Sequence, residues 1–169
     1  GLIANSLRVV LRASGYDDLY GKMIGERRLQ ELVKLEPAVP YRDALAEMLT
    51  ADGLLVFQGY TSNHAIPAKL YEYIRARRPI FAMAHAAGDT ARLLRDIGVG
   101  SIVPIDDAGK IAAGLAQFLA AIDGGRAPVA TVEQASRYSR AARAAELAKV
   151  LDSVAGIRRA PTAREPALV

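Results

Sequence analysis

The chain has 169 residues, of which 51% are hydrophobic and 24% are charged, and it contains no cysteine. A chain of this length fits one domain and can bury about 70% of its unfolded surface. The absence of cysteine excludes disulfides, metal sites with thiolate ligands and a cysteine nucleophile. Lys and Arg outnumber Asp and Glu by 22 to 18, a net charge of +4. This mild excess suits an anionic small ligand or an acidic membrane surface, and we expect no nucleic acid partner.

The apolar segments of the sequence are all short. None approaches the roughly 20 consecutive apolar residues that a helix needs to cross a bilayer. No charged segment followed by an apolar run opens the chain, so no signal peptide is visible. The two histidines, His64 and His85, are too few for a metal site built from several histidines. We therefore predict a cytoplasmic protein without a metal site.

Apolar runs and helical patterns alternate along the first 122 residues. Apolar runs predict strands over residues 7–11, 32–35, 53–57, 79–83 and 101–105. Helical spacing predicts helices over residues 17–32, 41–49, 65–77, 88–97 and 107–122. Continuous apolar strands are typical of strands buried on both faces, and their alternation with helices indicates parallel pairing. We predict a Rossmann-like α/β fold, with an open parallel sheet of about five strands flanked by helices, over residues 1–122.

The character of the sequence changes after residue 122. Residues 123–130 are rich in Gly and Pro and predict a linker, residues 131–155 predict one long C-terminal helix, and residues 156–169 predict a flexible tail. The long helix carries Arg137, Arg140 and Arg143. These arginines fit a solvated helix face, and the alternatives are docking on another domain or on anionic lipid.

Ligands of open parallel sheets bind beyond the carboxyl ends of the strands. The loop after the first strand contains Arg12 and Gly15. A glycine there allows either an ordinary turn or the close approach of the backbone to a ligand. The loop lacks the three-glycine dinucleotide fingerprint, so the sequence does not support a nicotinamide cofactor.

The segment after the third strand is the richest in polar groups. Its seven loop residues lead into a helix, where Ser62 or Asn63 is a candidate cap and the free amides offer an anion site. On that helix Lys69 and Glu72 form either an exposed ion pair or a site whose carboxylate accepts two ligand hydroxyls. His64 is interpreted as a loop histidine. For His85, after the next strand, the same crevice and open solvent remain alternatives.

This segment and its surroundings resemble the donor-binding half of retaining glycosyltransferases with the GT-B fold. The resemblance spans about residues 7–119, with a family-like trailing helix to residue 154, and it matches in register along its length. The blocks that carry it are ADGLLV at residues 51–56, IPAKLYEY at 66–73, RPI at 78–80, GVG at 98–100 and VKLEPAVPYRDALAEML at 33–49.

The resemblance implies a role for individual residues. In the family, two glutamates separated by seven residues lie on the loop and helix that correspond to residues 64–72. Glu72 matches the second, which is expected to hold the ribose hydroxyls of a UDP- or GDP-sugar, whereas His64 replaces the first, which lies near the donor sugar. The loop over residues 59–63 would run along the diphosphate and the sugar, the turn at residues 38–40 would border the base, and Arg12 and Gly15 would line the cleft. The site residues implied are Arg12, Gly15, Val39, Gly59, Thr61, Ser62, Asn63, His64, Lys69 and Glu72.

Two parts of the family's enzymes have no counterpart in the chain. These are the N-terminal acceptor domain and the opening strand and helix of the donor domain. Because the first strand of such a sheet is central, we expect a gap between the strands at residues 7–11 and 53–57. An unpaired strand edge invites association with another chain, so we also consider a homodimer.

The resemblance implies transfer of a hexosyl unit to an acceptor hydroxyl with retained configuration. The expected setting is the assembly of surface polysaccharides or glycoconjugates in the cytoplasm, at the inner face of the membrane. No catalytic residue is assigned within the chain, which alone is expected to bind the donor weakly and to turn over nothing. The alternatives are a GT-B-fold nucleotide-sugar epimerase and a non-catalytic α/β interaction module.

Overall fold

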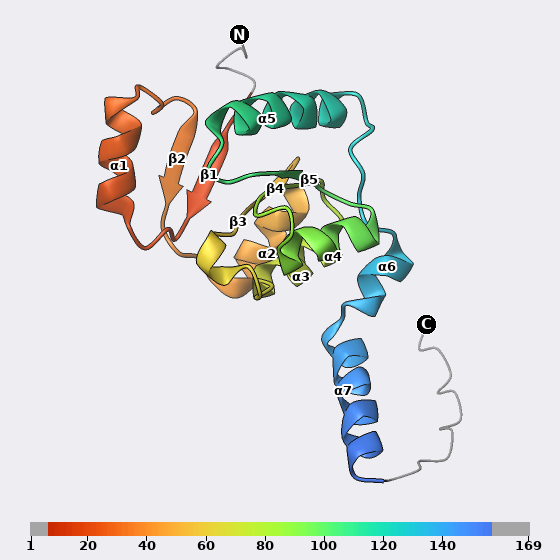
Figure 1. Ribbon diagram of the computed structural model, residues 1–169. Coiled ribbons are helices and arrows are strands. Elements are labelled where there is room, and N and C mark those ends of the chain that lie inside the picture. Colours follow the sequence, from red (N-terminus) through yellow and green to blue (C-terminus); the bar gives the residue numbers. More distant parts are fainter. Residues whose placement is uncertain (1–6, 157–169) are drawn as a thin grey trace. The chain divides into compact units, whose positions relative to one another are not determined.

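The computed structural model describes residues 7–156 and has a mixed α/β architecture (Figure 1). Contacts within the chain divide it into two compact units, one ending at Ala46 and the other beginning at Glu47. None of the helices in the described part of the chain is long and apolar enough to cross a membrane.

The first unit is built around two parallel strands. Strand β1 (Val9–Arg12) pairs with β2 (Val33–Glu36), and helix α1 (Asp17–Glu26) connects them. Helix α2 (Tyr41–Thr50) follows β2 and crosses the boundary between the units. The prediction that the helix from residue 17 extends to residue 32 is wrong. Arg28 adopts a left-handed backbone (φ 55°), which ends the helix and returns the chain to β2.

The second unit contains a sheet of three parallel strands. These are β3 (Leu54–Phe57), β4 (Ile80–Met83) and β5 (Ser101–Val103), in the order β3-β4-β5. The connections between them contain α3 (Ala68–Ala76) and α4 (Asp89–Ile97), and α5 (Ala108–Asp123) follows β5. Figure 1 shows α5 on one side of this sheet and α3 and α4 on the other.

The central strand of the three-stranded sheet is buried on both faces. All four residues of the central strand β4 are buried, as its uninterrupted apolar sequence predicts. On one face Ile80 and Ala82 belong to a core that receives apolar side chains from α3 and α4; on the other, Phe81 and Met83 belong to a core that includes Phe118 of α5. The first of these cores includes Val56, Leu70, Ile74, Leu93, Leu94, Ile97 and Val99.

The predicted α/β class with five parallel strands is confirmed. The strands form two sheets, however, and not the single open sheet that was predicted. Within residues 7–156 no strand pairing joins β1 to β3, so the break falls where a gap was expected.

The single helix predicted over residues 131–155 is wrong: the chain forms α6 (Val132–Arg137) and α7 (Arg140–Val154). Each has its own start, because the hydroxyl of Thr131 caps α6 and the hydroxyl of Ser139 accepts a hydrogen bond from the Ala142 amide at the start of α7. The side chain of Gln134 fastens α6 to the end of α4 by donating to the Ile97 carbonyl at 2.8 Å. Helix α7 buries none of its residues.

The structure changes both ends of the linker that was predicted over residues 123–130. Helix α5 extends to Asp123, and Ala130, at the end of the predicted linker, is buried in the core beside α3 and α4. Its carbonyl accepts a hydrogen bond from Arg77 Nε at 2.9 Å. Apart from Gly156, the tail predicted over residues 156–169 lies outside the described residues.

Candidate functional site

The carboxyl ends of β3, β4 and β5 lie at the same edge of their sheet, because all three strands are parallel. The loops that leave this edge cover residues 58–67, 84–88 and 104–107. In open parallel sheets this edge is where ligands bind. The residues on these loops therefore form the candidate site of the second unit.

Gln58 holds the first of these loops in place. Its side chain is buried, and its Nε2 donates to the carbonyl oxygens of Ser62 and Ala65. Its own amide continues the pairing of β3 with β4 by donating to the Met83 carbonyl at 3.0 Å. The loop is thus anchored from its first residue, which leaves the side chains at its tip free to face outward.

Tyr60 connects the three loops. Its ring lies edge-on to that of His85, with 5.2 Å between the ring centroids, and its hydroxyl donates to the carboxylate of Asp106. That hydrogen bond, with smaller effects from desolvation and from the charge of Asp106, raises the pKa of Tyr60. Nδ1 of His85 accepts from the Ala87 amide at 3.3 Å, so a neutral imidazole carries its proton on Nε2, where it can serve as a donor. A phenol, an imidazole and a carboxylate therefore meet at this edge.

The loop after β3 also contacts the start of α4. The Asp89 amide donates to the Asn63 carbonyl at 2.8 Å. Between them lies Gly88, where a Cβ atom would come within 3.2 Å of the His85 carbonyl and 3.4 Å of Asn63 Oδ1. Two buried side-chain oxygens, Asn63 Oδ1 in this loop and Thr90 Oγ1 in the first turn of α4, have no hydrogen-bond partner. Such atoms reduce stability, because they lose water without gaining a replacement.

The buried hydroxyl of Thr90 leads to a stability prediction. The Thr90→Val substitution removes an unpartnered oxygen from a side chain that is 1% exposed and replaces it with a methyl group of similar size. We expect the free energy of unfolding to rise by about 1 kcal/mol, measured by urea denaturation. The matched control Thr131→Val removes a hydroxyl that caps α6 and should lower it by about 1 kcal/mol. A loss of stability at position 90 would contradict the prediction.

Helix α3 begins later than the sequence pattern suggests. Its N-cap is Pro67, without a side-chain hydrogen bond, and its first residue is Ala68, so the prediction that Ser62 or Asn63 caps the helix is wrong. The reason is steric, since a residue that precedes proline is disfavoured in the helical conformation and the helix cannot extend back through residue 66.

The two charged candidates on α3 lie in different surroundings. Lys69 is exposed in the first turn of the helix, whereas Glu72, one turn later, is half-buried. Burial and, as the smaller cause, the charge of Glu72 raise the pKa of Tyr73. The carboxylate of Glu72 is therefore close to a partly buried phenol.

Four further residues predicted for the site lie in the loop after β3 and are exposed to solvent. Gly59, Thr61, Ser62 and His64 are exposed. Gly59 has an ordinary extended backbone (φ −69°), and a Cβ there would meet no atom within 4 Å. The conformation of the loop does not require glycine at this position, so any need for it would come from a ligand.

The other predicted residues belong to the first unit. Arg12 Nη1 donates to the Pro37 carbonyl at 2.6 Å, which joins the end of β1 to the turn that contains Val39. Gly15 has a left-handed backbone (φ 76°), which other residues rarely adopt. This supports the interpretation of residues 12–17 as a βα turn in which glycine is required by conformation.

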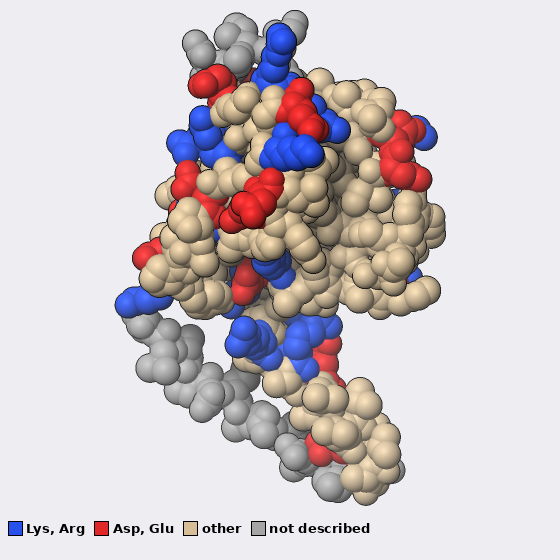
Figure 2. Space-filling model, turned by 90° about the vertical axis from the view of Figure 1, so that its left-hand side faces the viewer, with Lys and Arg blue, Asp and Glu red and all other residues tan. Residues whose placement is uncertain are grey.

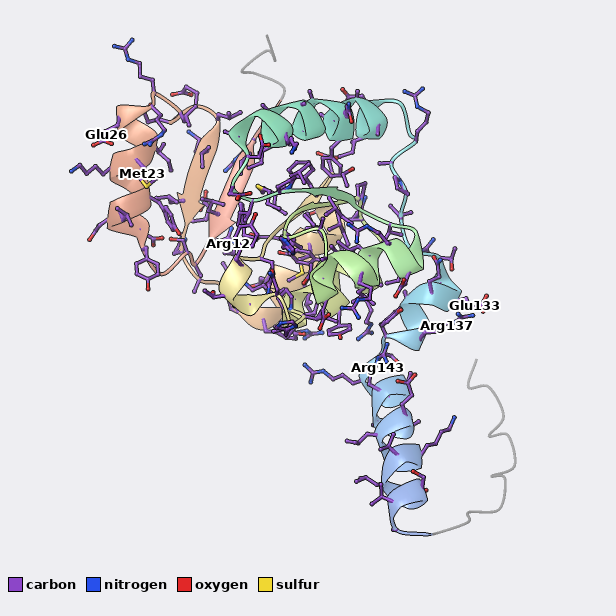
Figure 3. All side chains as sticks on the ribbon, in the orientation of Figure 1. Arg12, Met23, Glu26, Glu133, Arg137 and Arg143 are labelled. Carbon is purple, nitrogen blue, oxygen red and sulfur yellow. The ribbon has the colours of Figure 1, made fainter. Side chains whose placement is uncertain are left out.

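Two arginines of the C-terminal helices have acidic neighbours. Arg137 pairs with Glu133 at 2.7 Å; Arg143 pairs with Glu146 at 2.6 Å, and its guanidinium lies 4.6 Å from the centre of the Tyr138 ring. Figure 3 labels Glu133, Arg137 and Arg143, and Figure 2 shows basic and acidic side chains intermixed on the face it presents. Pairs of this kind are typical of a solvated helix surface.

Comparisons with protein-family models, with curated proteins and with solved structures found no match. The assignment of a function therefore depends on the residues of this chain and their arrangement.

Three residues of this edge were not singled out from the sequence: Gln58, Tyr60 and Asp106. Each follows directly or closely after a strand, and that position was the only signal for them. His85, for which two environments were open, lies beside Tyr60 and faces the loop after β3.

Proposed function

We propose that this chain is the nucleotide-sugar-binding domain of a retaining glycosyltransferase with the GT-B fold. The observation that carries the proposal is the place of Glu72, half-buried on the helix that follows the loop at the carboxyl end of β3. The parallel strands and the positions of β3, α3 and β4 within residues 51–83 fit the same proposal. The sequence blocks that resemble the family cover these elements.

In this proposal the ligand is a UDP- or GDP-sugar bound along α3 and its preceding loop. The carboxylate of Glu72 accepts hydrogen bonds from the ribose hydroxyls. Lys69 and the amides at the start of α3 stabilise the diphosphate, since a helix N-terminus attracts anions. The loop from Gly59 to His64 lies along the diphosphate and the sugar.

The chemistry assigned to such a domain is positioning and charge stabilisation. Transfer to an acceptor hydroxyl needs the donor held in a reactive orientation and the leaving diphosphate stabilised as it gains charge. The acceptor, and the N-terminal domain that would bind it, are further partners in the proposal. We place the reaction in the cytoplasm, at the inner face of the membrane, in surface polysaccharide or glycoconjugate synthesis.

A second candidate function, a nucleotide-sugar epimerase of the same fold, is favoured by one specific feature. His85 and the carboxylate of Asp106 both lie at Tyr60, and an epimerase needs ionisable groups that converge on the sugar. Incubation with a UDP-sugar in the absence of any acceptor distinguishes the two. Formation of the epimer, detected by NMR, supports the epimerase, and an unchanged sugar argues against it.

Calorimetric titration of the chain with UDP and with GDP tests the main proposal. We expect one of them to bind weakly, and Glu72→Ala to reduce its affinity about 10- to 100-fold, the loss expected for hydrogen bonds to a charged group. The matched control is Glu146→Ala, which removes a glutamate on the surface of α7 and should leave the affinity unchanged. If neither nucleotide binds at millimolar concentration, or if Glu72→Ala changes nothing, the proposal is wrong.

A further inference from the structure

Tyr60, His85 and Asp106 bring three kinds of polar group to the carboxyl edge of the β3-β4-β5 sheet. Each comes from a different one of the loops that leave this edge. The ring of Tyr60 is 43% exposed and lies edge-on to that of His85, and its hydroxyl donates to the Asp106 carboxylate. These contacts join the loops, but they use only part of the hydrogen-bonding capacity of the three side chains.

His85 presents a hydrogen-bond donor in a fixed orientation. Its Nδ1 accepts from the Ala87 amide at 3.3 Å, and its carbonyl accepts from the Gly88 amide at 2.9 Å. Both bonds hold the half-buried residue in the loop after β4. The proton of the neutral imidazole therefore lies on Nε2, and within residues 7–156 Nε2 has no acceptor. This donor is available to a ligand.

Asp106 presents acceptors that no positive charge neutralises. A carboxylate can accept about four hydrogen bonds, and the Tyr60 hydroxyl supplies one of them. Asp106 is exposed, and no cation of residues 7–156 forms an ion pair with it. The adjacent Asp107 differs, because Lys110 Nζ lies 3.1 Å from its carboxylate. A negative charge without a counterion repels phosphate, so the surroundings of Asp106 favour a neutral ligand with hydroxyl groups.

We propose that Tyr60, His85 and Asp106 bind the sugar unit of the nucleotide-sugar. Asp106 accepts hydrogen bonds from the sugar hydroxyls, and His85 Nε2 donates to a sugar oxygen. A sugar needs acceptors and donors together, whereas a phosphate needs donors alone. The exposed ring of Tyr60 adds an apolar surface for the C–H groups of the sugar. The inference rests on the proposed function, because nucleotide binding along α3 brings the sugar to this edge.

Tyr60 has two separable roles in this site. Its ring contacts the sugar, and its hydroxyl holds the Asp106 carboxylate in place. Tyr60→Phe keeps the ring and removes the hydrogen bond, so it leaves all the groups that touch the sugar but lets Asp106 move. We therefore expect Tyr60→Phe to weaken sugar binding less than Asp106→Ala does.

Calorimetric titrations of each nucleotide with and without its sugar measure what the sugar adds. The pairs are UDP with UDP-glucose, UDP with UDP-galactose, and GDP with GDP-mannose. One of these sugar-nucleotides should bind the natural chain about 10-fold more tightly than its nucleotide, the gain expected for hydrogen bonds to a charged group. Asp106→Ala and His85→Ala should each remove most of this gain and leave the affinity for the nucleotide unchanged. Tyr60→Phe should remove a smaller part.

Asp96→Ala is the matched control for the loss of a carboxylate. Asp96 is exposed and lies in the last turn of α4, whereas the edge lies at the start of this helix. The full gain should remain in this variant. A sugar-nucleotide that binds no more tightly than its nucleotide, or a gain that survives both Asp106→Ala and His85→Ala, overturns the inference and leaves nucleotide binding through Glu72 intact.

NMR of the imidazole signals tests the sugar site without a nucleotide. The chain has only two histidines, so the signals that disappear in His85→Ala belong to His85. Glucose, galactose and mannose are added separately at about 100 mM, well above a millimolar dissociation constant. One of them should shift the His85 signals of the natural chain but not those of Asp106→Ala. If no nucleotide binds, such a shift supports the sugar site and refutes only the proposed function, whereas unchanged signals refute both.

Discussion

Replacement of Phe81 with alanine is expected to lower the free energy of unfolding by about 3–5 kcal/mol. Phe81 lies on the central strand β4, is 1% exposed, and packs against Phe118 of α5 with 5.4 Å between the ring centroids. The substitution removes the largest fully buried side chain in the described residues, and the strand and helix around it can close the cavity only in part. Urea denaturation followed by circular dichroism measures the loss.

The matched control for Phe81 is the same substitution at Phe57. Phe57 also lies on a strand of this sheet, but its side chain is 56% exposed. Phe57→Ala should lower the free energy of unfolding by at most about 1 kcal/mol. Equal losses at the two positions would show that Phe81 is not packed as the structure describes.

A second large effect is expected at Gly114, where α5 lies closest to the sheet. A Cβ on Gly114 would come 2.5 Å from Cγ1 of Val103 on β5. Val103 is buried and β-branched, so its methyl group has no low-energy position to move to. We expect Gly114→Ala to lower the free energy of unfolding by about 1–2 kcal/mol, because the steric cost exceeds the roughly 1 kcal/mol that alanine adds to helix stability.

Two further variants isolate the contact at Gly114. Gly109→Ala, also on α5, places its Cβ 3.4 Å from Asp107 Oδ1 and meets no other neighbour, so it should raise the free energy of unfolding by up to about 1 kcal/mol. In a double-mutant cycle, Val103→Ala should relieve part of the cost of Gly114→Ala, because it removes the methyl group that the new Cβ meets. If Gly114→Ala stabilises the protein, the close approach of α5 to the sheet is refuted.

The positions of the strands could be predicted from the sequence because each is a local apolar run. The ends of the helices could not. Helix α1 stops where Arg28 turns left-handed, α3 starts only after Pro67, and the C-terminal helix restarts at the Ser139 cap. Proline and serine were visible in the sequence, but their effect depends on the path that the chain takes to the next strand.

The candidate site was predictable only in part. The sequence pattern drew attention to the loop from Gly59 to His64 and to Glu72, because polar residues there directly follow a buried strand. It did not indicate that Tyr60 would contact His85 and Asp106. These three residues come from separate loops, and only the parallel order β3-β4-β5 brings the loops together.

By itself, the sequence determined the α/β class, the parallel direction of the strands and the edge at which polar residues gather. These properties follow from the spacing of apolar residues along short segments, which is a local property. Within residues 7–156, only the tertiary structure decided that the strands divide into two sheets and that Tyr60, His85 and Asp106 meet. Each of these depends on contacts between residues far apart in the chain, which local spacing does not encode.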